Sequence, residues 1–252
     1  MDTNTPQYSP QSIARYECIF GRDFVSTGGL NTTKSLTAAL GLRPGMRVLD
    51  VGCGLGGSVF HLAQAYGVEV LGIDVLPQMI DEAARRSRAY GISAVEFVLG
   101  DILQVDLPTS FDLVYSRDAF LHIAQKPALF ARLFACLRPG GILFFTDYAR
   151  GHAQGSRAFE HYRAANSYDL HELDKYATLV RAAGFAEVGV TDRTEGFIAV
   201  LRQEMQAIQT ADIPLDEADR RYLVERWFHK VEYCQEGDMR WCSIRGSRRP
   251  TC

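Results

Sequence analysis

The feature that most constrains the fold is a glycine-rich turn, residues 52–57 (GCGLGG), between a short apolar run and an amphipathic one. The apolar run, residues 46–52 (MRVLDVG), predicts a buried strand, and the run after the turn predicts a helix through Tyr66 that Gly67 ends. Only glycine lets a backbone turn this tightly and lets a ligand approach the main chain closely. The sequence therefore predicts a parallel sheet with a ligand site at the carboxyl end of its first strand.

Strands and helices alternate strictly from about residue 46 to residue 148. The other strands expected in this stretch are 68–75, 94–101, 111–118 and 142–148, and the other helices are 77–91 and 126–141. Downstream, the pattern predicts a helix at 177–185, a strand at 186–194, a helix at 195–209 and a last strand at 239–245. This alternation predicts an α/β fold with a doubly wound, mostly parallel sheet.

We expect one domain over residues 1–252, because no repeat or low-complexity linker divides the chain. Within it, residues 1–40 are expected to form a helical N-terminal cap and residues 41–148 the ligand-binding core. Residues 149–175 follow the fifth strand and are polar and rich in Tyr, His and Arg, which is typical of a lid over the site. Residues 176–252 are expected to complete the sheet and add helices.

The charge balance argues against a nucleic-acid-binding protein. Lys and Arg number 27 and Asp and Glu number 30, so the net charge is -3 rather than strongly positive. The competing hypothesis uses arginines near the C-terminus, which are Arg240, Arg245, Arg248 and Arg249. Arginines beside a terminal strand are more often solvated surface, and we therefore expect no nucleic-acid partner.

The apolar stretches and the cysteines indicate the cellular environment of the protein. No apolar run approaches the roughly 20 residues needed to span a bilayer, and the start of the chain lacks the basic and apolar regions of a secretory signal. The six cysteines include no CxxC pair. We expect a cytoplasmic protein with reduced thiols, no membrane insertion and no zinc site.

Three acids follow successive expected strands around the glycine turn. Asp50 precedes the turn, where an amino group of a ligand would be near, and Asp74 ends the second strand, from which a carboxylate can accept both hydroxyls of a ribose. Asp101 could accept from an adenine amino group while Ile102 packs on the ring. Each acid alone is usually a solvated helix cap, and the glycines alone also suit a dinucleotide. Together they favour S-adenosylmethionine, because a dehydrogenase would not require Asp50.

This spacing resembles that of class I S-adenosylmethionine-dependent methyltransferases, which have a Rossmann-like fold and an LRPGG turn like residues 137–141. Enzymes that methylate an amino group of nucleic acid or protein glutamine have a (D/N/S)PP(Y/F/W) motif after the fourth strand. This chain has residues 116–122 (SRDAFLH) at that place, which argues against that class. Asp118 and Asp147 are candidate Mg²⁺ ligands, but each is better explained by organising the donor or a strand end. The histidines at 161, 171 and 229 match no helix-face metal pair, so no metal site is expected.

The whole chain, from Gln7 to about Arg245, resembles the phosphoethanolamine N-methyltransferases of plants, nematodes and protozoan parasites. The motifs that carry the resemblance are YECIFG at 16–21, VSTGGL at 25–30, SRDAFLH at 116–122, TDY at 146–148 and YDLH at 168–171. The family segment that YECIFG and VSTGGL match closes over the methyl donor.

The resemblance implies a role for each matching position. The positions implied to bind S-adenosylmethionine are Tyr16, Val25, Ser26, Asp50, Gly52, Gly54, Asp74, Val75, Asp101, Ile102 and Arg117. Tyr8 and His122 match the catalytic dyad of the family. The positions implied to bind the substrate are Gln7, Tyr16, Asp118, Tyr148, Tyr162, Asn166, Tyr168 and Lys230. One of them departs from the family, which has a phosphate-clamping arginine where this chain has Asn166.

The implied reaction is methyl transfer from S-adenosylmethionine to a small anionic amine, with S-adenosylhomocysteine as the second product. We expect phosphoethanolamine or its methylated forms as substrate, phosphocholine as the end product, and a monomer or weak dimer. A protonated amine cannot attack, so a base such as His122 is useful, and a Tyr8–His122 hydrogen bond would orient the imidazole. Asn166 leaves open sarcosine, dimethylglycine, or a phosphonate or sulfonate amine as substrate.

Overall fold

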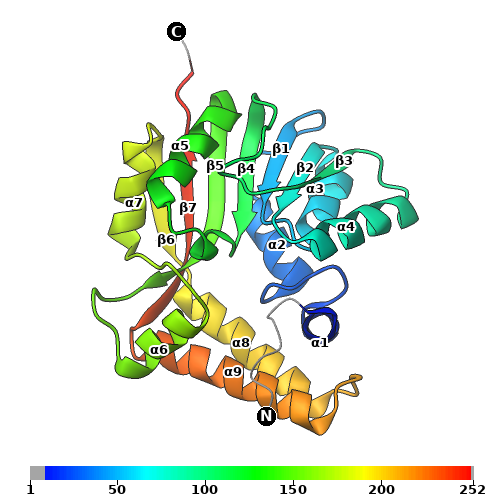
Figure 1. Cartoon of the computed structure of the whole chain (residues 1–252), viewed down its shortest axis with the longest axis vertical. Coiled ribbons are helices and arrows are strands. Elements are labelled where there is room, and N and C mark those ends of the chain that lie inside the picture. Colours follow the sequence, from blue (N-terminus) through cyan, green and yellow to red (C-terminus); the bar gives the residue numbers. More distant parts are fainter. Residues whose placement is uncertain (1–8, 251–252) are drawn as a thin grey trace.

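The computed structural model describes residues 9–250, and these residues form a sheet of seven strands in the order β3-β2-β1-β4-β5-β7-β6 (Figure 1). The strands are β1 (Arg47–Val51), β2 (Glu69–Asp74), β3 (Val95–Leu99), β4 (Phe111–Arg117), β5 (Leu137–Arg150), β6 (Ala186–Asp192) and β7 (Met239–Ser247). Strands β1 to β5 pair in parallel, whereas β7 runs antiparallel to β5 and β6. The predicted doubly wound, mostly parallel sheet is confirmed.

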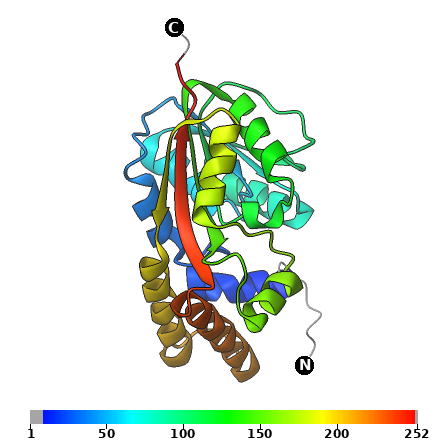
Figure 2. The ribbon, with the colours of Figure 1, turned by 90° about the vertical axis from the view of Figure 1, so that its left-hand side faces the viewer.

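Helices cover both faces of the sheet and the carboxyl ends of its parallel strands (Figures 1 and 2). Those beside the sheet are α2 (Gly29–Thr37), α3 (Gly57–Tyr66), α4 (Pro77–Ala89), α5 (Lys126–Cys136) and α7 (Leu173–Ala182). Those beyond the carboxyl ends are α1 (Pro10–Phe20), α6 (Arg157–Ala165), α8 (Thr194–Thr210) and α9 (Glu217–Gln235). None of the helices within residues 9–250 has the length and apolar composition that a membrane span needs.

The hydrophobic core is split by the sheet into two clusters. Val48 of β1 packs in one cluster and the next residue, Leu49, packs in the other, and both side chains are fully buried. Strands covered on both faces in this way read as continuous apolar runs, because successive side chains point to opposite sides. This double burial fixes the register of the central strands and with it the positions of the loops at their carboxyl ends.

The predicted helix over 126–141 was too long at its C-terminal end. Helix α5 ends at Cys136, and residues 137–141 (LRPGG) instead begin the long strand β5. Pro139 disfavours a helical conformation at Arg138, and Leu137 pairs with Phe111 of β4. The end of β7 reinforces this arrangement, since the amide of Arg248 donates to the carbonyl of Gly141 at 2.9 Å.

The N-terminal segment is bound to α4 by a cluster of charged groups. The Arg86 guanidinium donates to Asp23 at 2.7 Å and to both carboxylate oxygens of Glu17, one of them at 3.0 Å. The hydroxyl of Tyr90 also donates to Asp23 at 2.9 Å. Because the Arg86 side chain is 9% exposed, these charge-assisted bonds are shielded from water and hold the segment over the glycine turn.

The contact between this segment and α3 leaves no space for a side chain at Gly57. A Cβ there would lie 2.6 Å from the carbonyl oxygen of Asp23 and 2.7 Å from the ring of Phe24. Gly57→Ala is therefore expected to lower the free energy of unfolding by about 1–3 kcal/mol. The control Gly196→Ala in α8, whose Cβ meets no atom within 4 Å, should be neutral or stabilising by up to about 1 kcal/mol. Urea denaturation measures both, and equal midpoints would contradict the prediction.

Candidate active site

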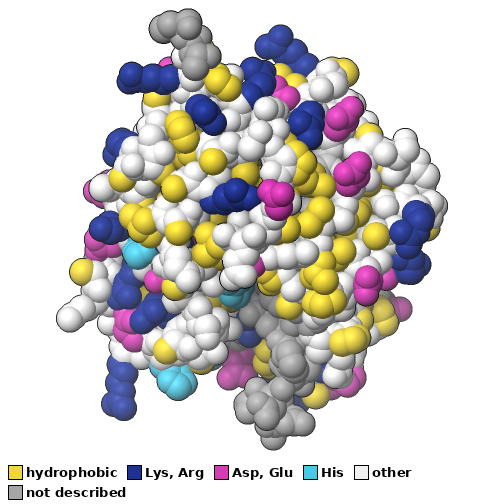
Figure 3. Space-filling view, turned by 45° about the horizontal axis from the view of Figure 1, so that its top comes forward, with side chains coloured by type: hydrophobic (Ala, Val, Ile, Leu, Met, Phe, Trp, Pro, Cys, Tyr) yellow, Lys and Arg dark blue, Asp and Glu magenta, His cyan; other side chains and the backbone are white. Residues whose placement is uncertain are grey.

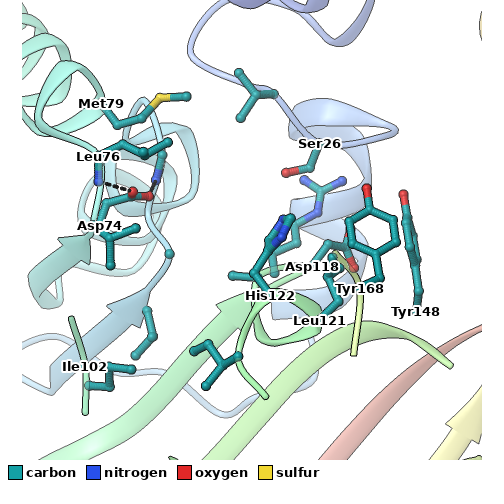
Figure 4. Close-up of a pocket in the computed structure, with 18 of the residues that line it drawn as sticks. Ser26, Asp74, Leu76, Met79, Ile102, Asp118, Leu121, His122, Tyr148 and Tyr168 are labelled. Carbon is teal, nitrogen blue, oxygen red and sulfur yellow. Dashed lines mark hydrogen bonds between the residues drawn. The ribbon is translucent and has the colours of Figure 1, made fainter. Parts of the chain in front are cut away.

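A cavity of about 460 Å³ opens at the carboxyl ends of the parallel strands. Its walls come from the turn after β1, the loops after β2, β3 and β4, the segment before α2, and helix α9. Figure 4 shows two groups of side chains on opposite sides of this space, which are Asp74, Leu76 and Met79 on one side and Asp118, His122, Tyr148 and Tyr168 on the other. The cavity therefore connects the glycine turn with a polar, aromatic end.

The turn after β1 is shaped by glycines in the left-handed region. Gly52 and Gly54 have φ angles of 76° and 53°, and a Cβ at Gly52 would lie 2.3 Å from the Cβ of Ala119. The amides of Gly52 and Cys53 donate to the carbonyl of Ile73 at 2.8 and 3.0 Å. The turn thus stays bound to the end of β2 while its main chain borders the cavity.

Asp74, the last residue of β2, connects the turn to the segment that leads into α4. Its Oδ2 accepts from the amide of Gly54 at 2.9 Å, and its Oδ1 accepts from the amide of Leu76 at 3.0 Å. Burial raises the pKa of Asp74, and these two amides oppose that shift. Each carboxylate oxygen can accept a further hydrogen bond, so Asp74 retains the capacity to bind two neighbouring hydroxyls.

The other two acids of the glycine turn differ in position. Asp50 is 2% exposed and lies in β1 beneath the turn, and it is not among the described residues that line the cavity. Burial, followed by the charge of Asp74, raises the pKa of Asp50 to about 8. Asp101 lines the cavity and accepts a hydrogen bond from the amide of Leu103 at 2.9 Å, and the buried Ile102 lies beside it.

Arg117, at the end of β4, fixes the segment that leads into α2. Its guanidinium donates to the carbonyl of Gly29 and the hydroxyl of Thr33, both at 2.8 Å, and to the carbonyl of Thr27. Residues 25–27 line the cavity next to these bonds. Arg117 therefore holds this segment in place through buried hydrogen bonds, and it also borders the cavity.

Glu204 of α8 connects the same segment to α9. Its Oε1 accepts from the amide of Gly28, and its Oε2 accepts from the indole of Trp227, each at 2.6 Å. Burial raises the pKa of Glu204, and the hydrogen bond from Trp227 opposes the shift. One buried carboxylate thus spans the gap between the N-terminal segment and the C-terminal helix that lines the cavity.

His122 ends a short 3-10 helix after β4 (Phe120–His122) and borders the cavity. Its ring packs edge-on against Tyr168, with ring centroids 5.3 Å apart. Desolvation by the surrounding protein lowers the pKa of His122, and the charge of Lys126 lowers it further. The imidazole is therefore neutral at pH 7 and can accept a proton from a group bound beside it.

Asp118 stands next to the cavity in an unusual backbone conformation. Its φ of 54° lies in the left-handed region, which costs about 1–3 kcal/mol for residues other than glycine and is found most often at functional sites. Its Oδ1 accepts from the hydroxyl of Thr146 and from the indole of Trp241, both at 2.8 Å. Within residues 9–250 these bonds fix one carboxylate oxygen of Asp118 and leave Oδ2 to accept from a ligand.

The aromatic end of the cavity contains a buried cation. Lys230 of α9 is 6% exposed, and its ammonium donates to the hydroxyl of Tyr148 at 2.9 Å. Burial, followed by repulsion from Arg226, lowers the pKa of Lys230 to about 7. The rings of Tyr148 and Tyr168 pack edge to face, with centroids 6.1 Å apart. Cations and hydroxyls that converge in this way suit an anionic group.

The phosphoethanolamine N-methyltransferase of Plasmodium falciparum is 33% identical to this chain over 202 residues, which cover 79% of this chain and 75% of that protein. The chain belongs to the phosphoethanolamine N-methyltransferase family. A family model described as a methyltransferase domain matches residues 48–141, which include the glycine turn and its acids.

Other phosphoethanolamine N-methyltransferases match nearly the whole chain. Phosphoethanolamine N-methyltransferase 1 of Arabidopsis thaliana is 41% identical over 243 residues, which cover 93% of this chain and 49% of that protein. The chain thus spans about half the length of the plant relatives that it matches. The structure of phosphoethanolamine N-methyltransferase 2 of Haemonchus contortus, with phosphomonomethylethanolamine and S-adenosylhomocysteine, has a TM-score of 0.93 at 29% identity and covers 98% of this chain and 58% of that one.

Most of the positions that match this phosphoethanolamine N-methyltransferase family are brought together in the cavity. Those in its walls are Tyr16, Val25, Ser26, Gly52, Gly54, Asp74, Val75, Asp101, Ile102, Arg117, Asp118, His122, Tyr148, Tyr168 and Lys230. Gln7 and Tyr8 lie outside the described residues. Tyr162 packs behind Tyr168, with ring centroids 5.8 Å apart, and Asn166 ends α6; neither is among the described residues that line the cavity.

Arg226 lines the cavity although the sequence pattern predicts no helix between residues 210 and 238, where α9 lies. The signal was present in the sequence. Asp216 caps α9 by accepting from the amide of Asp219, and Leu223, Trp227 and Val231 repeat at helical spacing. A helix in this register puts Arg226 one turn before Lys230 and on the same side.

Proposed function

We propose that this chain transfers methyl groups from S-adenosylmethionine to the nitrogen of phosphoethanolamine and its methylated forms, and so makes phosphocholine and S-adenosylhomocysteine. The observation that carries this proposal is one cavity with two unlike ends. The glycine turn and Asp74 form one end, and Lys230 with tyrosine hydroxyls forms the other. The family membership supports the same substrates, because its relatives from plants, nematodes and Plasmodium are named for this reaction.

The residues at the glycine turn fit S-adenosylmethionine. Gly52 leaves main chain open to a ligand, and Asp74 has acceptor capacity for the hydroxyls of a ribose. Asp101 and Ile102 also line the cavity, and they would supply an acceptor and an apolar surface to an adenine. When bound, the donor supplies an electrophilic methyl group on a sulfonium. Asp50 is buried beneath the turn, and its assignment to donor binding rests on the family resemblance.

The acceptor amine must lose its extra proton before it attacks, and it must lie in line with the methyl group. Oδ2 of Asp118 can bind the ammonium form, and the neutral imidazole of His122 can take its proton. The freed lone pair must then be held about 3–3.5 Å from the methyl carbon. Tyr8, the second member of the proposed dyad, would orient the imidazole and latch the N-terminal segment over the donor.

The tail arginines give less support to a nucleic-acid-binding protein. Arg248 donates to the carbonyl of Leu137 at 2.7 Å, and Arg240 lies 3.6 Å from the carboxylate of Asp192. Side chains of both charge signs are scattered over the face seen in Figure 3. The two arginines are therefore engaged within the fold, which favours the cavity as the functional site.

A screen of small amines tests the proposal. S-adenosylhomocysteine release should be measured with phosphoethanolamine, its methylated forms, aminoethylphosphonate, glycine, sarcosine and dimethylglycine. We expect turnover on phosphoethanolamine or its methylated forms, with no turnover on glycine derivatives. Activity on glycine derivatives alone, with none on any phospho-amine, would overturn the substrate assignment.

The donor site makes a prediction about Asp74. Asp74→Ala removes a charged acceptor and is expected to weaken S-adenosylmethionine binding by about 1.5–3 kcal/mol. The control Glu96→Ala removes an exposed carboxylate from the neighbouring strand β3 and should leave the affinity unchanged. Isothermal titration calorimetry compares the two, and equal affinities would contradict the assignment of Asp74.

The role of His122 makes a prediction about rate and pH. His122→Ala should lower kcat by roughly 10²–10⁴-fold, with a smaller change in donor affinity. Because the pKa of His122 is lowered, the imidazole stays neutral below its ordinary titration range, so the acid limb of kcat/KM should fall below about pH 6.5. The control is His161→Ala, an exposed histidine on α6. Near-normal turnover of His122→Ala across pH 6–9 would make the histidine structural.

A further inference from the structure

The position that departs from the family lies beside a guanidinium from another helix. Asn166 ends α6, and its side-chain amide donates back to the carbonyl of Tyr162 at 2.8 Å, so its own helix orients it. Its Oδ1 accepts from the guanidinium of Arg226 at 3.4 Å. A guanidinium therefore lies beside residue 166 although it comes from α9, sixty positions along the chain.

Arg226 has no acidic partner among the ion pairs of residues 9–250. Within the same residues its guanidinium donates to two neutral oxygens, Oδ1 of Asn166 at 3.4 Å and the hydroxyl of Tyr222 at 3.3 Å. Both bonds are long for a guanidinium, whose bonds to a charged acceptor are shorter and about twice as strong. Arg226 is half-buried and lines the cavity, and it forms no ion pair within residues 9–250, so its guanidinium is available to an anion bound there.

Lys230, one turn further along α9, likewise forms no ion pair within residues 9–250. Arg226 and Lys230 are four residues apart on the same side of the helix, and both line the cavity. Like charges at this spacing destabilise a helix, and repulsion from Arg226 contributes to the lowered pKa of Lys230. An anion bound between the two side chains would offset this repulsion and favour the charged form of Lys230.

The acids that face this region are already committed to other groups. Glu204 accepts from the amide of Gly28 and the indole of Trp227. Asp118 accepts through Oδ1 from Thr146 and Trp241, and its second oxygen belongs to the amine end in the proposed reaction. Neither acid forms an ion pair with Arg226 or Lys230. The ligand itself is left to supply the negative charge.

We propose that Arg226 on α9, together with Lys230, binds the phosphate of the acceptor, and that it replaces the family arginine whose position is held here by Asn166. This inference rests on the proposed function for the identity of the acceptor. A guanidinium binds phosphate through two parallel hydrogen bonds, which an asparagine cannot supply. The acceptor is then clamped from α9, the helix that also carries Lys230, rather than from α6.

The first experiment measures steady-state kinetics with phosphoethanolamine. Arg226→Gln should raise KM roughly 10- to 100-fold, with a smaller effect on kcat, because a charged bond to the phosphate is lost. Arg226→Lys keeps the positive charge but cannot donate two parallel hydrogen bonds, so its KM should lie between those of the wild type and Arg226→Gln. The matched control is Arg221→Gln on the same helix, whose side chain is 66% exposed. S-adenosylhomocysteine affinity and melting temperature identify variants that are misfolded rather than weakened in phosphate binding.

The decisive comparison moves the arginine back to α6. Asn166→Arg in the Arg226→Gln background should recover most of the lost KM, because one guanidinium again reaches the phosphate. Asn166→Arg alone should not improve KM, because it sets two guanidinium groups against each other. If Arg226→Gln leaves KM unchanged, or if Asn166→Arg lowers KM equally in both backgrounds, Arg226 does not bind the phosphate.

A binding measurement separates this inference from the proposed function. Inorganic phosphate is titrated into wild-type protein and Arg226→Gln, each saturated with S-adenosylhomocysteine. Weaker phosphate binding in the variant supports the Arg226 site even if wild-type protein turns over no phospho-amine, an outcome that would overturn the function alone. Equal phosphate affinity in both proteins would overturn the Arg226 site whatever the turnover.

Discussion

The hydrogen bonds between the glycine turn and the end of β2 are the constraint on which the site depends. The amides of Gly52 and Cys53 bind the carbonyl of Ile73, and the amide of Gly54 binds the carboxylate of Asp74. These bonds hold the main chain close to the cavity without a side chain in between. The neighbouring strands are buried on both faces and cannot change register without exposing core residues. The site therefore inherits its rigidity from the sheet.

The sequence was sufficient for the elements that depend on local pattern. The alternation of strands and helices, the glycine turn and the acids at the strand ends follow from periodicity and from the conformational freedom of glycine, so the order of elements could be predicted. The sequence pattern was not sufficient where pairing with distant strands decides the secondary structure. Residues 137–141 enter a strand because β4 and β7 pair with them. The burial of Asp50 beneath the turn depends on how deep β1 lies, which a spacing pattern does not report.

The two ends of the cavity differ in how visible they were in the sequence. The end at the glycine turn is built from three loops of one repeating supersecondary unit, so a few spacings describe it. The aromatic end draws on β4, β5, the segment around Tyr168 and α9, which are distant in sequence and meet only in the folded chain. Arg226 illustrates the difference, because its neighbour Asn166 lies on another helix. Resemblance to a family identifies the positions that match. It does not identify a residue on another element that takes over the role of a missing one.

The carboxylate of Glu204 has a consequence for the order of events at the cavity. It bonds the amide of Gly28, in the segment over the glycine turn, and the indole of Trp227, which adjoins the two cations of α9. A ligand that shifted either element would strain the bond to the other and would so change the free energy of binding at the other end. Such linkage is reciprocal by thermodynamic necessity. Linkage of this kind would change both binding steps by the same factor, and it would need no hinge, because a single side chain joins the two elements.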